Sequence, residues 1–489
     1  RTEAFQAFNG GSIPPTRSVK RNLLFIIFSS IFIFFLFFLT PLDTDLGWHL
    51  RYGEYFVKTL HFLRTNEFTY YLPGYIWHNS FAGYGIILFI IYKTFGLIGL
   101  NFTCSLLMVF IYVFFVLTYP RSNRTSFLLF LLLIIFSWSV LYLGIRAQLV
   151  SFFLTTVVFY LIEKSESNIN KLWFLPPIFL VWANVHGAFA FGLLIIFVNI
   201  LDKVLSKEKN IYKLVIIFLC SFFVTLINPY NIGIYNEGFL HLTYPLGKLI
   251  AEWVPPNLNY IFLIIIISIF TITSLFITKT KRKFFFTALI MIFATLAITA
   301  KRNLPYISLV WCESLLYVFQ KKLYKIEENE RFTEFTVLII ILGLIYVLSN
   351  SLPRNYTTSI NSDQYCYNNF VKYPCPAIQF LKDKSIKNKN IFNNYEWGGY
   401  LEWVSPDNIY FVDGRMPTWK TPENLSPYTV FLNIMQAQPG YKTTLDKYKT
   451  DVLLIGQGSF LDLELLQNHS TWEEIYRDKI SVIYIRKQK

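Results

Sequence analysis

Two carboxylates, Asp43 and Asp45, come directly after the first long apolar run of the chain. Such a run is expected to cross a membrane, so both side chains should lie at the membrane surface. A carboxylate pair at that depth can coordinate a divalent cation, or it can act as a general base toward an acceptor hydroxyl or amide. The structural alternative is a helix N-terminus, at which Asp43 is the cap and Asp45 favours the helix dipole.

Four other polar residues lie at the ends of apolar runs. Arg146 and Arg302 either pair with lipid headgroups or bind the phosphate of a lipid-linked substrate, because a guanidinium fork matches phosphate oxygens. His186 lies where one run ends and the next begins, as a structural residue or as part of a site. Glu252 is either a loop residue or a carboxylate at the mouth of a helix. Polar groups at membrane depth are functional candidates, and their convergence on one side of the membrane strengthens each of them.

The C-terminal part of the chain contains a stretch rich in aromatic residues and glycine, which includes Trp397 and Tyr400. Aromatic rings stack on the apolar faces of sugars, and glycine lets a backbone approach a ligand closely. The stretch is therefore either a surface for a sugar or peptide or a turn within a folded core. The sequence Asp413-Gly414-Arg415 follows a strand-like run nearby.

The composition indicates a membrane protein. Hydrophobic residues make up 54% of the 489 residues and charged residues 15%, and the mean hydropathy is +0.43. A soluble domain has about 25% charged residues, so lipid is the expected solvent for much of the chain. The net charge of +14 does not indicate nucleic-acid binding, because Lys and Arg occur in short clusters between apolar runs, as in the anchoring loops of membrane proteins.

Apolar runs predict a polytopic α-helical membrane protein with about eleven transmembrane helices, since a span needs ~20 mostly apolar residues. The runs lie at residues 22–40, 99–118, 126–144, 149–162, 172–183, 188–200, 211–227, 260–278, 284–299, 305–319 and 335–348.

The distribution of positive charge predicts the topology. With the N-terminus inside and residues 81–92 as an interfacial helix rather than a span, every basic loop falls inside; these loops are residues 121–124, 164–171, 203–209, 279–283 and 321–331. We therefore expect an inside segment 1–21, a membrane domain 22–350 and an outside domain 351–489. The first outer loop, residues 42–98, then carries the acidic pair and the interfacial helices.

The outside domain is expected to have an α/β fold. Strand-like runs lie at residues 390–392, 409–412, 452–455 and 480–485, and helix-like runs at 377–384 and 461–467. Cys366 and Cys375 lie in this domain. They either form a disulfide, if the domain is in an oxidising compartment, or remain free thiols.

These features together resemble the GT-C superfamily of integral-membrane glycosyltransferases, which includes oligosaccharyltransferases, protein mannosyltransferases and aminoarabinose transferases. Members have an acidic motif and interfacial helices in the first outer loop, many spans, and often an outer C-terminal domain. Asp45, Trp48, His49 and Arg51 are similar to the oligosaccharyltransferase pattern, in which an Asp is followed six residues later by Arg, with aromatic residues between. The stretch around Trp397 is similar to that family's Trp-Trp-Asp-Tyr-Gly acceptor motif, but it lacks the Trp pair and the Asp.

The resemblance implies an inverting glycosyltransferase of the bacterial cytoplasmic (inner) membrane. A polyprenyl-phosphate-linked sugar would come from the bilayer, its phosphate would meet Arg302 or Arg146, and Asp45, with Asp43, would activate a glycan, lipid or protein acceptor. The further candidates for substrate contact are His186, Arg51, Trp397 and Tyr400. The resemblance also implies a divalent cation, Mg²⁺ or Mn²⁺, that would stabilise the leaving charge. Its expected ligands are Asp45, Asp43, Glu252 and His49.

Two other function classes fit the same pattern. A transporter or flippase of a lipid-linked glycan usually has repeats and broken helices with charges at the midplane. The sequence has no visible repeat, and its polar residues lie at one surface, which favours the enzyme. A non-catalytic membrane assembly protein would tolerate an Asp45→Asn substitution, whereas an enzyme would lose turnover.

Overall fold

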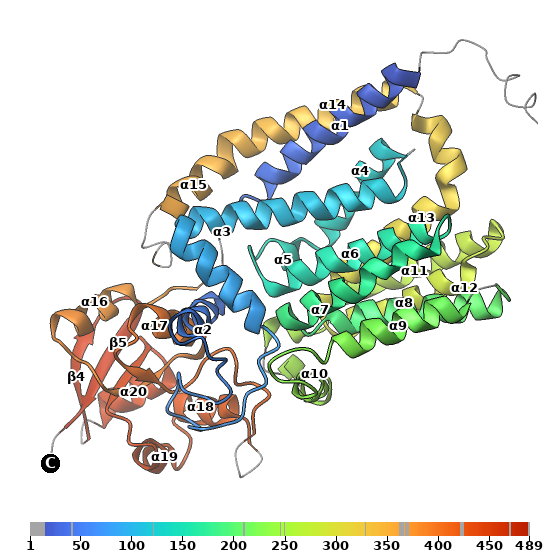
Figure 1. Cartoon of the computed structure of the whole chain (residues 1–489). Helices are drawn as coiled ribbons and strands as arrows, with labels where there is room; N and C mark the ends of the chain where they lie inside the picture. Colours follow the sequence, from blue (N-terminus) through green and yellow to red (C-terminus); the bar gives the residue numbers. More distant parts are fainter. Residues whose placement is uncertain are drawn as a thin grey trace, which may run out of the picture.

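The computed structural model describes residues 15–40, 43–120, 122–208, 211–244, 246–248, 250–327, 329–360, 366, 371–420, 425–468 and 471–487. They form a helical bundle with a small α/β domain at one end (Figure 1). The bundle helices are α1 (Pro15–Leu36), α3 (Ala82–Thr118), α4 (Asn123–Phe136), α5 (Trp138–Leu141), α6 (Ala147–Ser165), α7 (Leu175–Val185), α8 (Phe189–Leu205), α9 (Ile211–Val224), α11 (Leu258–Ile277), α12 (Lys283–Thr299), α13 (Leu304–Glu327), α14 (Glu330–Tyr346) and α15 (Leu352–Ile360). The connecting segments include α2 (Leu46–Thr59), α10 (Gly233–Thr243), η2 (Ile169–Phe174), η3 (Leu246–Lys248), η4 (Ala251–Trp253), η5 (Lys301–Asn303) and η6 (Val347–Ser351).

Each apolar run predicted to span the membrane overlaps a helix of the bundle. Four helices among the described residues are long and apolar enough to cross a membrane, namely Ala82–Thr118, Ala147–Ser165, Leu258–Ile277 and Glu330–Ser359. Shorter apolar helices are Asn22–Leu36, Asn123–Phe136, Ile211–Val224 and Lys283–Thr299. The helical architecture is therefore confirmed, while the number of about eleven spans stays a prediction.

The predicted separation of residues 81–92 from the following span corresponds to a sharp bend in α3. At the bend, Gly96 has φ 60° and ψ −152°, a conformation that only glycine adopts without strain. The part of α3 before Gly96 runs at a steep angle to the rest of the helix, across the end of the bundle (Figure 1). This course is the one expected of a helix that lies in a membrane interface.

Ion pairs join several of the basic loops that the sequence assigns to one side of the membrane. Arg124 Nη1 lies 3.1 Å from Glu327 Oε2, and Arg282 Nη1 lies 3.4 Å from Glu163 Oε2. These contacts occur at the end of the bundle opposite the sheet (Figure 1). The shared location supports a common side for these loops, and the assignment of that side to the inside stays a prediction.

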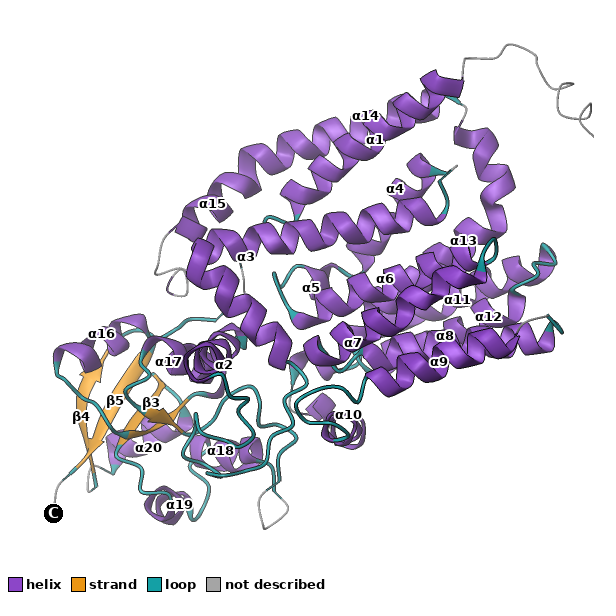
Figure 2. Ribbon diagram, viewed as in Figure 1, coloured by secondary structure: helices purple, strands orange, loops and turns teal. Residues whose placement is uncertain are grey.

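The C-terminal domain contains a five-stranded sheet of order β2-β1-β3-β5-β4, in which β2, β1 and β3 are parallel and β5 and β4 are antiparallel (Figure 2). Its elements are α16 (Cys375–Asp383), β1 (Asn390–Asn393), η8 (Tyr395–Trp397), α17 (Gly398–Val404), β2 (Ile409–Tyr410), α18 (Pro427–Met435), α19 (Tyr441–Lys447), β3 (Val452–Gly456), α20 (Phe460–Gln467), β4 (Trp472–Arg477) and β5 (Ser481–Arg486). All four strand-like runs and both helix-like runs of the sequence are found here. The charged strand β4 and the helices α17 to α19 were not predicted.

The last helix of the bundle runs past residue 351, where the sequence analysis starts the outside domain, and that boundary stays a prediction. Helix α14 continues through η6 into α15 and ends at Ile360, because the polar residues after the apolar run find partners beside the bundle. For example, Asn355 Nδ2 donates to the backbone carbonyl of Phe38 over 2.8 Å. Beyond this helix, Cys366 and Cys375 form a disulfide.

The first outer loop and the C-terminal domain pack against each other. Helix α2 contacts α17, and the backbone N–H of Tyr70 donates to the carbonyl of Tyr410 in the edge strand β2 over 3.0 Å. The sheet is therefore attached to the loop that carries the acidic pair (Figure 2).

Candidate active site

The acidic pair lies at the start of α2. Asp45 is the residue before the helix, with φ −85° and ψ −11°, and its side chain makes no capping hydrogen bond within the described residues. Asp43 Oδ1 accepts the backbone N–H of Asp45 over 3.3 Å, which is not a cap of the helix. Neither carboxylate thus caps α2 through its side chain, while the position of Asp45 at the helix N-terminus remains favourable for the helix dipole.

Three other segments bring their charged residues to the same place. Arg146, just before α6, lies with Nε 3.3 Å from Asp43 Oδ2 and with Nη1 2.6 Å from Glu252 Oε2. Arg302, in η5, lies with Nη1 3.3 Å from Glu252 Oε1, and its guanidinium is 4.4 Å from the centre of the Trp253 ring. These four charged side chains form one continuous network, which we call the outer charge network: Asp43, Arg146, Glu252 and Arg302.

Burial and charge act differently on the carboxylates of this region. Burial works against ionisation of Glu252, but the guanidinium groups of Arg146 and Arg302 outweigh it and lower the pKa of Glu252 to about 2. For Asp45 the balance is opposite, because burial and then the charge of Asp43 raise its pKa to about 7. Asp45 is therefore the carboxylate that can accept a proton near neutral pH.

The C-terminal domain closes over Asp45. A Cβ atom at Gly414 would collide with Asp45 Oδ1, so only glycine leaves room for this carboxylate. The neighbouring Arg415 is buried, lies 2.5 Å from Asp413 Oδ2 through Nη2, and has its guanidinium 4.9 Å from the centre of the Trp77 ring in the first outer loop. The Asp-Gly-Arg sequence thus follows the carboxyl end of β2, where ligands commonly bind in α/β sheets, and it fixes the domain against the site.

His186 lies beside the outer charge network as a neutral side chain. Its Nδ1 is 2.5 Å from Ser151 Oγ, and the same hydroxyl accepts a hydrogen bond from Trp182 Nε1 over 2.7 Å. Burial, and then the positive charge of Arg302, lower the pKa of His186 to about 3. Ser151 was missed in the sequence, because a serine within an apolar run carries no signal of its own.

Three other residues selected from the sequence are engaged elsewhere. Arg51 Nη1 pairs with Glu54 Oε2 over 2.6 Å, one turn along the same helix. Trp397 and Tyr400 are buried in the C-terminal domain, where Trp397 Nε1 donates to the carbonyl of Lys372 over 3.0 Å and Tyr400 Oη donates to Cys375 Sγ over 3.1 Å. Their side chains pack the domain, and the backbone of Gly399 between them lies against Gly47 and Trp48 of α2.

Two of the four residues expected to bind a metal are engaged by arginine. Asp43 and Glu252 both pair with Arg146, and Glu252 pairs with Arg302 as well. His49 is buried, and its Nδ1 makes no hydrogen bond to any described residue. No group of three or more His, Cys, Asp or Glu side chains in the described part of the chain is placed to hold a metal ion. Arginine therefore occupies the space between the carboxylates of Asp43 and Glu252, and the divalent cation itself stays a prediction.

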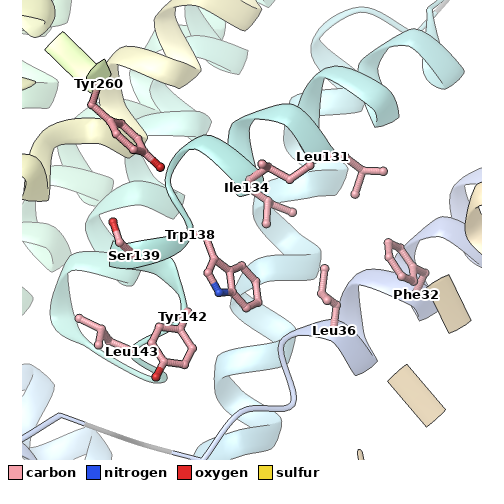
Figure 3. Close-up of a pocket in the computed structure, with 10 residues that line it drawn as sticks. Phe32, Leu36, Leu131, Ile134, Trp138, Ser139, Tyr142, Leu143 and Tyr260 are labelled. Carbon is pink, nitrogen blue, oxygen red and sulfur yellow. The ribbon is translucent and has the colours of Figure 1, made fainter. Parts of the chain in front are cut away.

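An apolar groove lies close to the network. It has a volume of about 780 Å³ and is lined by side chains of α1, α4, α5 and α11, including Leu36, Trp138, Tyr142 and Tyr260 (Figure 3). On the other side of the α5 segment, a cavity of about 20 Å³ is lined by Arg146 and by residues that include Gln148, Arg302 and Tyr306. The segment from Trp138 to Arg146 thus separates an apolar surface from the charged site.

Comparison with known proteins gives a likeness in structure only. No family model matches the sequence, and no curated protein matches it. The archaeal oligosaccharyltransferase AglB from Archaeoglobus fulgidus, in complex with an inhibitory peptide and a dolichol-phosphate, is similar with a TM-score of 0.60 and 11% identity, over 96% of this chain and 75% of that one. ArnT from Cupriavidus metallidurans, bound to undecaprenyl phosphate, is similar with a TM-score of 0.53 and 10% identity, over 96% of this chain and 98% of that one.

A structure of the Archaeoglobus fulgidus oligosaccharyltransferase in complex with Zn and sulfate has a TM-score of 0.55 and 11% identity, over 94% of this chain and 73% of that one. At such low identities the likeness establishes the fold. The resemblance predicted from the sequence is confirmed at that level.

Proposed function

From the GT-C fold, we propose that this protein transfers a sugar or glycan from a polyprenyl-phosphate-linked donor to an extracytoplasmic acceptor, with inversion at the anomeric carbon. The observation that carries the proposal is the outer charge network beside a half-buried Asp45 with a raised pKa, at the end of the bundle that meets the C-terminal domain. We place the protein in a bacterial inner membrane with this end outside. The acceptor class is a glycan, a lipid or a protein.

The donor lipid fits the apolar groove. Its isoprenoid chain would lie along Leu36, Trp138 and Tyr142, and its phosphate would reach Arg302 and Arg146 past the α5 segment. The cavity of about 20 Å³ holds one water molecule at most. The phosphate must therefore take the place of Glu252 beside Arg302, exchanging one anion for another. Two similar structures, which hold dolichol-phosphate and undecaprenyl phosphate, support a lipid phosphate as the ligand.

Asp45 is assigned the role of general base. It accepts the proton of the acceptor hydroxyl or amide while the acceptor atom forms a bond to the anomeric carbon of the sugar. The bond from that carbon to the phosphate oxygen breaks on the opposite face, and the lipid phosphate leaves with the electron pair. Arg146 and Arg302 offset the negative charge that develops on this phosphate. Arg146 is held in place by Asp43 and Glu252, while Arg302 pairs with the phosphate instead of Glu252.

His186 and Gly414 are assigned positioning roles. The neutral His186, held through Ser151, lies near Arg302 without adding a charge. Gly414 lets the C-terminal domain press its backbone onto Asp45, so that the acceptor would bind between this domain and α2.

The proposal is tested with the full chain in lipid nanodiscs and a polyprenyl-phosphate monosaccharide with a labelled sugar. The expected result is release of polyprenyl phosphate when an extract of envelope acceptors is added, and a loss of at least about 100-fold in Asp45→Asn. The matched control is Asp407→Asn, which removes an exposed carboxylate that pairs with Lys387 over 3.2 Å at the domain surface; it should keep wild-type turnover.

Two other outcomes would redirect the assignment. Movement of the intact lipid-linked sugar across a vesicle membrane, with no released lipid phosphate, would favour the transporter or flippase. Equal behaviour of the wild type and Asp45→Asn, with neither chemistry nor transport, would favour a non-catalytic assembly protein.

A further inference from the structure

Arg146 lies between two carboxylates that come from different outer segments. Asp43 belongs to the first outer loop and Glu252 to η4, and the arginine joins them with distances of 3.3 Å and 2.6 Å. All three side chains are mostly buried, with exposed fractions of 13% for Arg146, 6% for Asp43 and 20% for Glu252. The guanidinium is therefore a fixed positive charge inside the site.

Two converging carboxylates at a membrane surface are the donor set that a hard divalent cation prefers. Here neither carboxylate is available to such an ion. The oxygens of Glu252 are shared between Arg146 and Arg302, and Oε1 also lies 3.5 Å from Gln148 Nε2. A divalent cation placed between Asp43 and Glu252 would have to displace the Arg146 side chain and would be repelled by its charge.

The arginine is itself stabilised as a cation by its surroundings. Burial works against its charge, but the carboxylates of Asp43 and Glu252 outweigh burial and raise the pKa of Arg146. Its side chain is also oriented at both ends, because Nε contacts one carboxylate and Nη1 the other. An arginine held in this way is preorganised toward an anion that arrives at its open side.

We propose that Arg146 supplies the positive charge that a divalent cation would supply between these carboxylates, so that the site works without a metal ion. The catalytic meaning of this inference rests on the transfer reaction proposed above. In that reaction, the guanidinium groups of Arg146 and Arg302 offset the charge on the departing lipid phosphate. The wild-type site has no vacancy for a cation, whereas removal of the arginine side chain creates one.

The test measures binding of Mn²⁺ alone, by the loss of its free-ion electron paramagnetic resonance signal, with the full chain in nanodiscs. The wild type is expected to have no Mn²⁺ site that depends on Asp43, so its Mn²⁺ binding should be the same as that of Asp43→Asn. Arg146→Asp, which leaves carboxylates at three positions around the space, is expected to gain one Mn²⁺ at micromolar concentration, and the double substitution with Asp43→Asn should lose it. Turnover of the wild type should change less than about twofold in EDTA.

Wild-type binding of one Mn²⁺ that disappears in Asp43→Asn or Glu252→Gln would overturn the inference. So would an Arg146→Asp protein that elutes as a folded, monodisperse species yet binds no Mn²⁺. If Arg146→Asp does not fold, the comparison of wild type with Asp43→Asn still decides. Because the Mn²⁺-binding measurements need no substrate, they remain valid if the proposed transfer reaction is wrong.

Discussion

The raised pKa of Asp45 predicts a steep pH dependence of turnover. A general base must be deprotonated, so the rate should rise with pH and level off above the pKa. With a pKa of about 7, about half of Asp45 is ionised at pH 7 and about 1% at pH 5, so the rate should fall about 50-fold between them. With the ordinary carboxylate pKa of 3.8, the rate would fall by less than about 10% between pH 7 and pH 5.

The physical cause of the shift predicts a second result. After burial, the charge of Asp43 is the largest contribution to the raised pKa of Asp45. Asp43→Asn should therefore move the midpoint of the pH profile to lower pH, so that the residual rate at pH 5 is a larger fraction of the rate at pH 7.

The assay is the initial rate of lipid-phosphate release from pH 5 to pH 8 in nanodiscs, at saturating donor and constant ionic strength, with Asp407→Asn as the control. A flat profile, or a midpoint that does not move in Asp43→Asn, would refute the assignment of Asp45 as the base.

Four other predictions follow from the same geometry. Arg302→Gln should raise the KM for the lipid donor about 10- to 100-fold, since a charge-assisted contact to phosphate is lost, and Arg302→Lys should raise it less; an unchanged KM for both would place the phosphate elsewhere. Ser139→Trp, which places an indole in the apolar groove (Figure 3), should raise the KM for a long-chain donor several-fold, about the binding lost with one buried methylene. The KM for a short-chain analogue should stay nearly unchanged. Gly414→Ala should lower turnover on the order of 100-fold by displacing Asp45, whereas Gly238→Ala, which meets no atom within 4 Å, should not; equal rates in the two would mean that Asp45 is not held by the domain. Cys375→Ser should lower the free energy of unfolding of the C-terminal domain by about 2–3 kcal/mol, as measured by limited proteolysis in urea, and a reductant should have the same effect on the wild type but no effect on Cys375→Ser.

The parts of the fold that could be predicted are those with a strong local pattern. Long apolar runs predict helices because a helix satisfies its backbone hydrogen bonds within one segment in lipid. The strand-like run that forms β3 is apolar and is buried over most of its length. By contrast, β4 contains Glu473 and Glu474 on exposed positions, and its pairing with β5 is set by the sheet. Nothing in its own sequence distinguishes it from a loop.

The candidate site shows the same division. Asp43, Arg146, Glu252 and Arg302 could be selected because charge next to an apolar run is costly and therefore uncommon. Which charges pair could not be predicted, since the paired residues lie far apart in the sequence: Arg146 lies 103 positions from Asp43 (146 − 43) and 106 from Glu252 (252 − 146). The expected metal ligands are an example: the carboxylates of Asp43 and Glu252 could be recognised in the sequence, but the position of Arg146 between them is visible only in three dimensions.

The most direct test of the central claim is a cryo-electron microscopy structure of the full chain in nanodiscs with a polyprenyl-phosphate monosaccharide. We predict that the phosphate lies within hydrogen-bond distance of Arg302 and Arg146. The isoprenoid chain should lie in the groove beside Trp138, and the anomeric carbon should face Asp45. A bound lipid whose phosphate lies away from both arginines, or whose sugar points away from Asp45, would contradict it.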